Sequence, residues 1–405
     1  MGVIYLDNNA TTRPADAVAD AMDEATRTRW ANPSSVHRAG QQVRQRLELA
    51  RASVAGLIAA RPRELIFTSG GTESNNLAIR GALDGPLGEG HKAALITTAV
   101  EHAAVREPAE ALAERGGTVE ALAGDAVGIV SPEDVAAAVE KHGEAQSILV
   151  SIQWANNETG VIQPIAEIAE AVGQVKRSLA ERFPERRRTV LFHVDATQAV
   201  GKLPVDVKAA GVDLLTLAGH KFHGPKGVGA LYVRTGVRLR AVQRGGPQER
   251  ERRGGTENTP GLVGLGVAAE LAAAFLADEG RIAELRAMRD GFERRVVERV
   301  EPAGVNAGGD TPRLWNTSNL AFPGLEAEAI LIGLSERGVC ASAGAACSSG
   351  SLEPSPVLKA MGLDEASAHG SVRFSLSRET TPDELDRAIE AIEAVVGKLR
   401  RTMPV

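Results

Sequence analysis

One stretch of the chain decides its fold class, and it reads Leu65-Ile66-Phe67-Thr68-Ser69-Gly70-Gly71-Thr72-Glu73-Ser74-Asn75-Asn76-Leu77. An apolar run is followed by two glycines and then by hydroxyl and amide residues that favour a helix start, so we predict a strand, a turn and a helix. The N–H groups and positive dipole end of such a helix bind anions, and glycines let a ligand approach the backbone. The alternative is an ordinary N-cap, in which Thr72 or Ser74 only closes the helix. No P-loop or dinucleotide-binding glycine motif is present.

Further apolar runs alternate with helical patterns on both sides of this stretch. The runs expected to form strands are 64–69, 93–98, 147–153, 189–194, 214–218 and 229–233. Each is apolar almost throughout, as in strands buried on both faces, and intervening helices such as 161–177 supply the crossovers of a mostly parallel sheet. The pattern therefore predicts an α/β architecture.

A second, smaller α+β unit is expected after the Gly- and Arg-rich stretch 244–259. A helix-prone segment runs from about residue 261 to residue 300. The segments that follow are strand-like 316–322, helical 327–337, strand-like 371–376 and helical 383–399.

Composition excludes several classes of protein. The 405 residues carry 46 Lys and Arg against 52 Asp and Glu, and this formal net charge of −6 argues against nucleic acid as the main partner. Two cysteines cannot form a disulfide framework and no clustered Cys/His spacing indicates a metal, so we expect a cytoplasmic protein without a metal site. The first residues lack the basic start of a signal peptide. The most apolar stretch, 263–277, is interrupted by Glu270 and is shorter than a membrane span, so we expect no membrane segment.

Two more strand ends place charged residues at the carboxyl edge of the sheet, where open α/β sheets bind ligands. Asp195 follows directly on the run 189–194, where it either caps a turn or pairs with a cationic group of a ligand. Lys221 follows the next strand among glycines and histidines, where apolar or cationic surroundings would make its amine nucleophilic. For Lys202 and Lys226 we prefer the simpler interpretation of surface lysines. An anion site, a carboxylate and an amine are the set that pyridoxal phosphate needs for its phosphate, pyridine nitrogen and aldehyde.

The two cysteines differ in their surroundings. Cys347 lies among Gly, Ala and Ser residues with almost nothing bulky to bury, so we expect it in an exposed loop where a thiol can react. The alternative is an incidental surface thiol. Cys340 follows Val339 where a strand should start, and we expect it to be a small buried hydrophobe.

These residues resemble the cysteine desulfurases of the NifS/IscS type, in the class V aminotransferase group of pyridoxal phosphate enzymes. The similarity covers essentially the whole chain, and Trp154, Asn258 and the Arg378 segment look closer to the nitrogen-fixation branch. The motifs that carry it are Tyr5-Leu6-Asp7-Asn8-Asn9-Ala10-Thr11-Thr12, Asn32-Pro33-Ser34-Ser35, Gly71-Thr72-Glu73-Ser74, Glu101-His102, Trp154-Ala155-Asn156-Asn157-Glu158-Thr159-Gly160, Asp195-Ala196-Thr197-Gln198, Gly219-His220-Lys221, Gly254-Gly255-Thr256-Glu257-Asn258, the Cys347 loop with Leu352-Glu353-Pro354-Ser355, and Val372-Arg373-Phe374-Ser375-Leu376-Ser377-Arg378.

The resemblance implies fold type I of the pyridoxal phosphate enzymes. Residues 14–262 would form the large, mostly parallel-sheet domain, and residues 1–13 with 263–405 the smaller α+β domain that carries the Cys347 loop. The chain departs from the family in two places. Ala218 stands where many relatives have a phosphate-binding Ser, and the Arg-rich run 176–188 lies in an insertion that we expect to be solvated.

The resemblance also implies roles for single residues. Lys221 would hold the cofactor aldehyde, Asp195 would pair with the protonated pyridine nitrogen, and Cys347 would accept the sulfur. The other implied roles are ring stacking by His102, contacts to ring substituents by Asn157 and Gln198, phosphate binding by Gly71, Thr72 and His220, phosphate binding in the other subunit by Thr256, and a clamp on the substrate carboxylate by Arg373 with Asn32.

The implied activity is removal of sulfur from L-cysteine, which leaves L-alanine and a persulfide on Cys347. Lys221 would take the α-proton, and His102 would carry a proton to or from the substrate. The enzyme would be a homodimer that passes sulfur to an iron–sulfur scaffold or another acceptor protein. A selenocysteine lyase shares this cofactor and fold and is the nearest alternative. A plain aminotransferase has no use for Cys347, and a non-catalytic scaffold has no use for Lys221 and Asp195.

Overall fold

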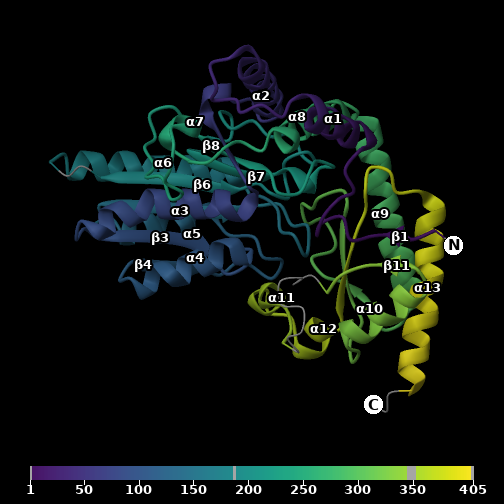
Figure 1. Ribbon diagram of the computed structural model, residues 1–405. Helices are drawn as coiled ribbons and strands as arrows, with labels where there is room; N and C mark the ends of the chain where they lie inside the picture. Colours follow the sequence, from purple (N-terminus) through teal and green to yellow (C-terminus); the bar gives the residue numbers. More distant parts are fainter. Residues whose placement is uncertain (1, 186–187, 344–352, 403–405) are drawn as a thin grey trace.

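A seven-stranded sheet forms the centre of the larger part of the molecule (Figure 1). The computed structural model describes residues 2–185, 188–343 and 353–402. The strand order is β2-β8-β7-β6-β5-β3-β4, and β8 alone runs antiparallel to its neighbours. The strands are β2 (Leu65–Thr68), β3 (Ala93–Thr98), β4 (Thr118–Leu122), β5 (Ser147–Gln153), β6 (Thr189–Asp195), β7 (Leu214–Ala218) and β8 (Gly229–Val233). The six predicted strands and the mostly parallel sheet are therefore confirmed.

Helices cover both faces of this sheet, which explains why its strands read as continuous apolar runs. In β5, Ile148 and Val150 face one core while Leu149 faces the other. Helices α3 and α4 pack on the face of Leu149, whereas α2, α5, α6 and α8 contribute to the opposite core. The helices of this part are α1 (Asp16–Thr28), α2 (Arg38–Leu57), α3 (Gly71–Gly88), α4 (Ala103–Glu114), α5 (Pro132–Lys141), α6 (Ile165–Arg182), α7 (Gln248–Glu251) and α8 (Thr259–Leu276), with 3₁₀ turns η1 (Pro62–Glu64) and η2 (Gly219–Lys221).

Helix α8 begins four residues before the apolar stretch considered from sequence, so its 18 residues are long and apolar enough to cross a membrane by length and composition alone. More than half of the helix is buried inside the protein. It packs along α1 and α2, and Leu262, Leu265 and Ala272 belong to the core of the large domain. Its apolar composition is thus explained by burial within the chain.

The second unit has its own hydrophobic core, which includes Ile4 and Leu6 from the N-terminus. Antiparallel strands form a sheet in the order β12-β10-β9, and β1 pairs in parallel with β11. Because α8 belongs to the first core, the change of domain falls near Leu276, not at the predicted residue 262. The elements are β1 (Ile4–Tyr5), α9 (Glu279–Arg299), β9 (Gly304–Val305), β10 (Thr317–Ala321), α10 (Ala327–Glu336), β11 (Val339–Cys340), α11 (Pro356–Ala360), α12 (Glu365–His369), β12 (Ser371–Ser375) and α13 (Pro382–Thr402).

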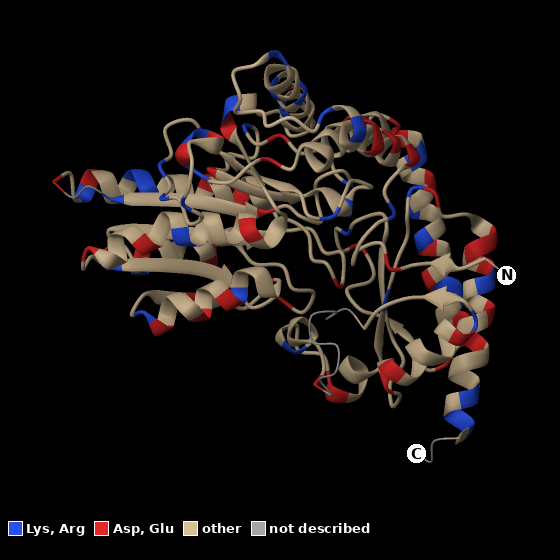
Figure 2. Ribbon diagram, in the orientation of Figure 1, with Lys and Arg blue, Asp and Glu red and all other residues tan. Residues whose placement is uncertain are grey.

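The outer helix α13 carries charges of opposite sign at its two ends. Asp383 and Glu384 lie in its first turn, and Arg400 and Arg401 in its last. Figure 2 shows the acidic residues at one end of this helix and the basic residues at the other. Both groups interact favourably with the helix dipole.

Candidate active site

A cavity of about 490 Å³ lies at the carboxyl ends of the parallel strands, between the two domains. Its walls come from the ends of β5, β6 and β7, from the start of α3 and from β12 of the small domain. Nine of the predicted site residues line it, namely Gly71, Thr72, His102, Asn157, Asp195, Gln198, His220, Lys221 and Arg373. Residues far apart in sequence thus meet where an open α/β sheet binds its ligand.

Asp195 is the last residue of β6 and is almost fully buried. Its Oδ2 accepts a hydrogen bond from Nδ2 of Asn75 at 2.7 Å, and its Oδ1 accepts one from the backbone N–H of Thr197 at 3.0 Å. Two donors hold the carboxylate in one orientation and leave it acceptor capacity for a cationic ligand group.

Lys221 ends the 3₁₀ turn η2 that follows β7. Its Nζ donates to the backbone oxygens of Asn9 and Ala10, at 2.7 and 2.8 Å. The N-terminal segment therefore holds this amine at the cavity through carbonyl groups.

The start of α3 has the predicted strand, glycine turn and helix, the local structure for which we predicted anion binding. Gly70 has φ of 151°, a conformation that side-chain-bearing residues rarely adopt, and Gly71 opens the helix. A Cβ atom on Gly71 would lie 3.0 Å from Oγ1 of Thr197, so glycine keeps this wall open. The hydroxyl of Thr197 is buried, lines the cavity and has no hydrogen-bond partner among the described residues.

His102 is the N-cap of α4, and its Nδ1 accepts the backbone N–H of Ala104 at 3.0 Å. Burial lowers the pKa of His102; the cationic Lys221 and Arg373 lower it further, against the opposing effect of Asp195. The ring is therefore neutral at pH 7, with its proton on Nε2.

His220 is also neutral. Burial and the nearby cations Lys221 and Lys226 lower its pKa to about 4, and its Nδ1 lies 3.1 Å from Oγ1 of Thr11. It can give a neutral hydrogen bond to an anion.

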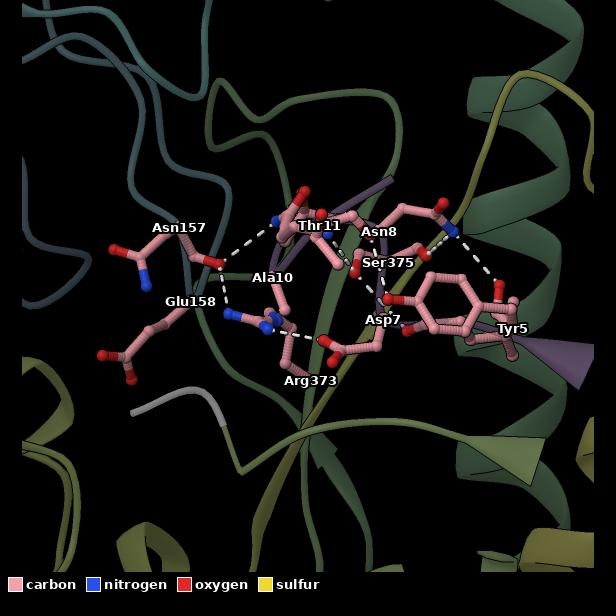
Figure 3. Close-up of polar contacts among 12 residues, drawn as sticks. Tyr5, Asp7, Asn8, Ala10, Thr11, Asn157, Glu158, Arg373 and Ser375 are labelled. Carbon is pink, nitrogen blue, oxygen red and sulfur yellow. Dashed lines mark hydrogen bonds and ion pairs between the residues drawn. The ribbon is translucent and has the colours of Figure 1, made fainter. Parts of the chain in front are cut away.

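Arg373 lies in β12 and is fully buried. Its Nη2 forms an ion pair with Oδ1 of Asp7 at 2.7 Å, and its Nη1 donates to the backbone oxygen of Asn157 at 3.0 Å. Figure 3 shows the guanidinium between these two residues. Asp7 and Asn157 thus fix the orientation of a cation in the cavity wall.

Two wall residues were quoted only as parts of motifs, with no role predicted. Asn9 is 1% exposed; its Nδ2 donates to the backbone oxygen of Asn157 and to Oγ1 of Thr317, and its N–H donates to Oγ of Ser375. Glu101 is fully buried, and its Oε2 has no hydrogen-bond partner among the described residues. Burial raises the pKa of Glu101 to about 8, so this carboxyl is protonated at pH 7.

Predictions for five residues need correction, fall outside this cavity or lie outside the described residues. Lys202, interpreted from sequence as a surface lysine, is 4% exposed, because the turn after β6 folds beneath the N-terminal segment. Cys340 is partly exposed rather than buried. Asn32 and Thr256 are exposed and do not line the cavity of a single chain. Cys347 lies outside the described residues.

The walls fit pyridoxal phosphate. Besides the hydroxyl of Thr197 and Oε2 of Glu101, the buried Oδ1 of Asn75 also has no partner among the described residues, and such atoms in a cavity indicate a polar ligand. The helix start offers N–H groups for a phosphate, Asp195 an anion for a protonated ring nitrogen, and Lys221 an amine for an aldehyde. No cluster of three or more His, Cys, Asp or Glu within the described ranges could hold a metal ion.

Comparison with known proteins identifies the family. The aminotransferase class-V family model matches residues 4–388. A cysteine desulfurase from a Nostoc species is 45% identical over 404 residues, which cover 100% of this chain and 95% of the relative. A solved NifS-like protein superposes with a TM-score of 0.86 at 34% identity, covering 98% of this chain and 100% of the other. SspA in complex with cysteine superposes with a TM-score of 0.75 at 34% identity, covering 93% and 99% of the two chains. The chain therefore belongs to the class-V aminotransferase family and, within it, to the cysteine desulfurases of the NifS/IscS type.

Proposed function

We propose that this protein is a pyridoxal phosphate-dependent cysteine desulfurase that converts L-cysteine to L-alanine and collects the sulfur as a persulfide on Cys347. The observation that carries this proposal is the convergence of Lys221, Asp195 and the α3 N-terminus on one cavity. The similar SspA is known in complex with cysteine, which supports the choice of substrate.

When bound, pyridoxal phosphate supplies an electron sink for carbanion chemistry at the substrate α-carbon. Gly71, Thr72, Thr197 and His220 would hold its phosphate, and Asp195 its pyridine nitrogen. Lys221 would hold the aldehyde until the substrate amine replaces it, and its Nζ would then take the α-proton.

Arg373 would orient the substrate carboxylate, because its guanidinium is already fixed by Asp7. The Cys347 thiolate would attack the substrate sulfur, so that the substrate carbon–sulfur bond breaks and alanine leaves. We further propose that an acceptor protein, such as an iron–sulfur scaffold, removes the sulfur, and that the enzyme acts in the cytoplasm.

A homodimer follows from the same proposal. Asn32 and Thr256 are both exposed, and Asn32 lies between Trp30 and Val36, which are 81% and 93% exposed. Large apolar side chains this exposed favour a protein interface, and a partner subunit there would bury them.

The test is a visible spectrum of the purified protein with and without L-cysteine, together with assays of alanine and sulfide. We expect bound cofactor and alanine formation in the natural chain and in Lys226→Ala, where an exposed lysine of the same loop is removed. Lys221→Ala should lose turnover and the adduct that borohydride fixes to the chain. Cys347→Ala should keep the cofactor but release no alanine, and Cys340→Ala should keep both. An adduct on Lys202 or Lys226 would contradict the assignment, and faster turnover of selenocysteine would favour a selenocysteine lyase.

A further inference from the structure

Lys202 is a buried lysine without an acidic partner. Its Nζ donates to Oε1 of Gln198 at 2.5 Å and to Oδ1 of Asn9 at 2.9 Å, and no carboxylate of the described residues forms an ion pair with it. Burial lowers its pKa well below the ordinary value, and Lys221 and Arg373 add to this effect. A lysine is rarely buried in this way, because removing the amine from water costs free energy. The two hydrogen bonds of Lys202, to the side-chain amides of Gln198 and Asn9, indicate which residues this buried lysine holds in place.

Those contacts decide which way the side-chain amide of Gln198 points. Nε2 faces the backbone oxygen of Asn9, at 2.9 Å, which can only accept, and Oε1 faces Nζ of Lys202, which donates to it. The reverse orientation would set the amide oxygen of Gln198 against a carbonyl oxygen and would lose the hydrogen bond from Lys202. The amide nitrogen has a second N–H, and Gln198 lines the cavity. Gln198 therefore offers a donor, not an acceptor, to a ligand.

Lys202 also reaches the amine of the active site through Asn9. The side-chain oxygen of Asn9 accepts from Lys202, while its backbone oxygen accepts from Nζ of Lys221 at 2.7 Å. Nearby, Gly201 has φ of 78°, and a Cβ atom there would lie 2.4 Å from Cβ of Phe222, the residue after Lys221. The turn that carries Lys202 is thus built tightly against the segment that carries Lys221.

We propose that Lys202 is a positioning residue for cofactor binding, which acts by fixing the amide of Gln198 as a hydrogen-bond donor toward an oxygen on the cofactor ring. This inference rests on the proposed binding of pyridoxal phosphate in the cavity. It assigns to Lys202 no contact with substrate or cofactor, since Lys202 does not line the main cavity.

The experiment is a double-mutant cycle between Lys202→Met and Gln198→Ala, read out as the dissociation constant of pyridoxal phosphate from the apo-protein and as its thermal midpoint. Methionine matches the length of lysine and needs no hydrogen bond, so the apo-protein should be as stable as the natural chain or more stable. We expect each single variant to bind the cofactor about 10-fold more weakly and the double variant to show no further loss. Lys226→Met, at an exposed site, should change neither quantity.

Unchanged affinity in Lys202→Met, or losses that multiply in the double variant, would overturn the inference. Loss of the apo fold in Lys202→Met would also overturn it, because the role would then be structural. Gln198→Glu provides an independent check, since its carboxylate can still accept from Lys202 but offers the cavity an acceptor. It should bind the cofactor more weakly than Gln198→Ala, and equal or tighter binding would refute the donor role. If the natural chain itself fails to bind pyridoxal phosphate, the proposed function falls together with this inference; if it binds, the cycle tests Lys202 alone.

Discussion

Glu101 should make the stability of the protein depend on pH. The pKa of this buried carboxyl is about 8, against 4.5 for an ordinary glutamate, so between these values the folded protein holds a proton that the unfolded chain has released. The free energy of unfolding must then fall as the pH rises through this window. The variant Glu101→Gln has no ionisable group at this position. Its free energy of unfolding should therefore rise relative to that of the natural protein between about pH 5 and about pH 8, by up to a few kcal/mol, and its thermal midpoint should rise with it. The exposed Glu110→Gln, on the helix α4 that follows Glu101, should show no such trend, and parallel curves for all three proteins would contradict the assignment.

His102 combines a capping role with a proposed catalytic one, and the two can be separated. Asparagine at this position keeps an N-cap acceptor but removes the ring, so His102→Asn should leave the thermal midpoint nearly unchanged. Turnover should fall by about 100-fold or more, the usual scale for loss of an acid–base group. His37 caps α2 in the same manner through its Nδ1, and His37→Asn is the matched control that should keep full turnover. Equal losses in both variants would show that only the cap matters.

At the residue scale, the sequence predicted which residues lie at the site when they end a strand or open a helix. Asp195 and Lys221 follow buried runs, and such positions meet at one sheet edge whatever the loops do. Lys202 and Asn9 could not be predicted in this way. Their contact joins residues almost two hundred positions apart, and nothing in the local pattern distinguishes a buried lysine from a surface one.

The helix α3 offers a comparison of two glycines in one element. Gly71 faces Thr197 across the cavity wall, whereas a Cβ atom on Gly88 would meet nothing within 4 Å. Gly71→Ala should therefore weaken cofactor binding several-fold with the fold intact, measured by titration of the apo-protein. Gly88→Ala should bind normally and be neutral or slightly more stable, since alanine has the higher helix propensity. Normal affinity in Gly71→Ala would exclude this wall from the phosphate site.

At the element scale, the sequence predicted the buried strands and missed β4. This strand lies at the edge of the sheet next to β3, and each of its residues from Thr118 to Leu122 is exposed or half-buried. Unlike β2 at the other edge, which is buried throughout, β4 lacks the continuous apolar run that marked the other strands, because part of its surface meets water. The order of strands was likewise set by contacts between distant segments, which the local pattern does not contain.

At the scale of the whole molecule, the proposed dimer can be tested by complementation. If Thr256 serves the phosphate site of the other subunit, a hybrid of Lys221→Ala and Thr256→Ala chains contains one site with both natural residues. Mixed dimers should then regain cofactor binding that neither variant shows alone, measured as bound pyridoxal phosphate per dimer. Arg253 on the same loop pairs with Glu73 of its own α3, at 2.8 Å, so Thr256 could instead serve its own subunit. In that case no hybrid site is intact and mixing restores nothing.

The segment around Asn9 has a consequence for synthesis on the ribosome. The N–H of Asn9 donates a hydrogen bond to Oγ of Ser375, and the carboxylate of Asp7 is paired with Arg373, so each residue finds a partner that is translated 366 positions later. A nascent chain released before β12 emerges cannot seat Asn9, and with it the carbonyl that receives the amine of Lys221. Prematurely terminated polypeptides are thus unable to assemble the vitamin B6 pocket. Binding of the coenzyme therefore requires that translation has passed β12.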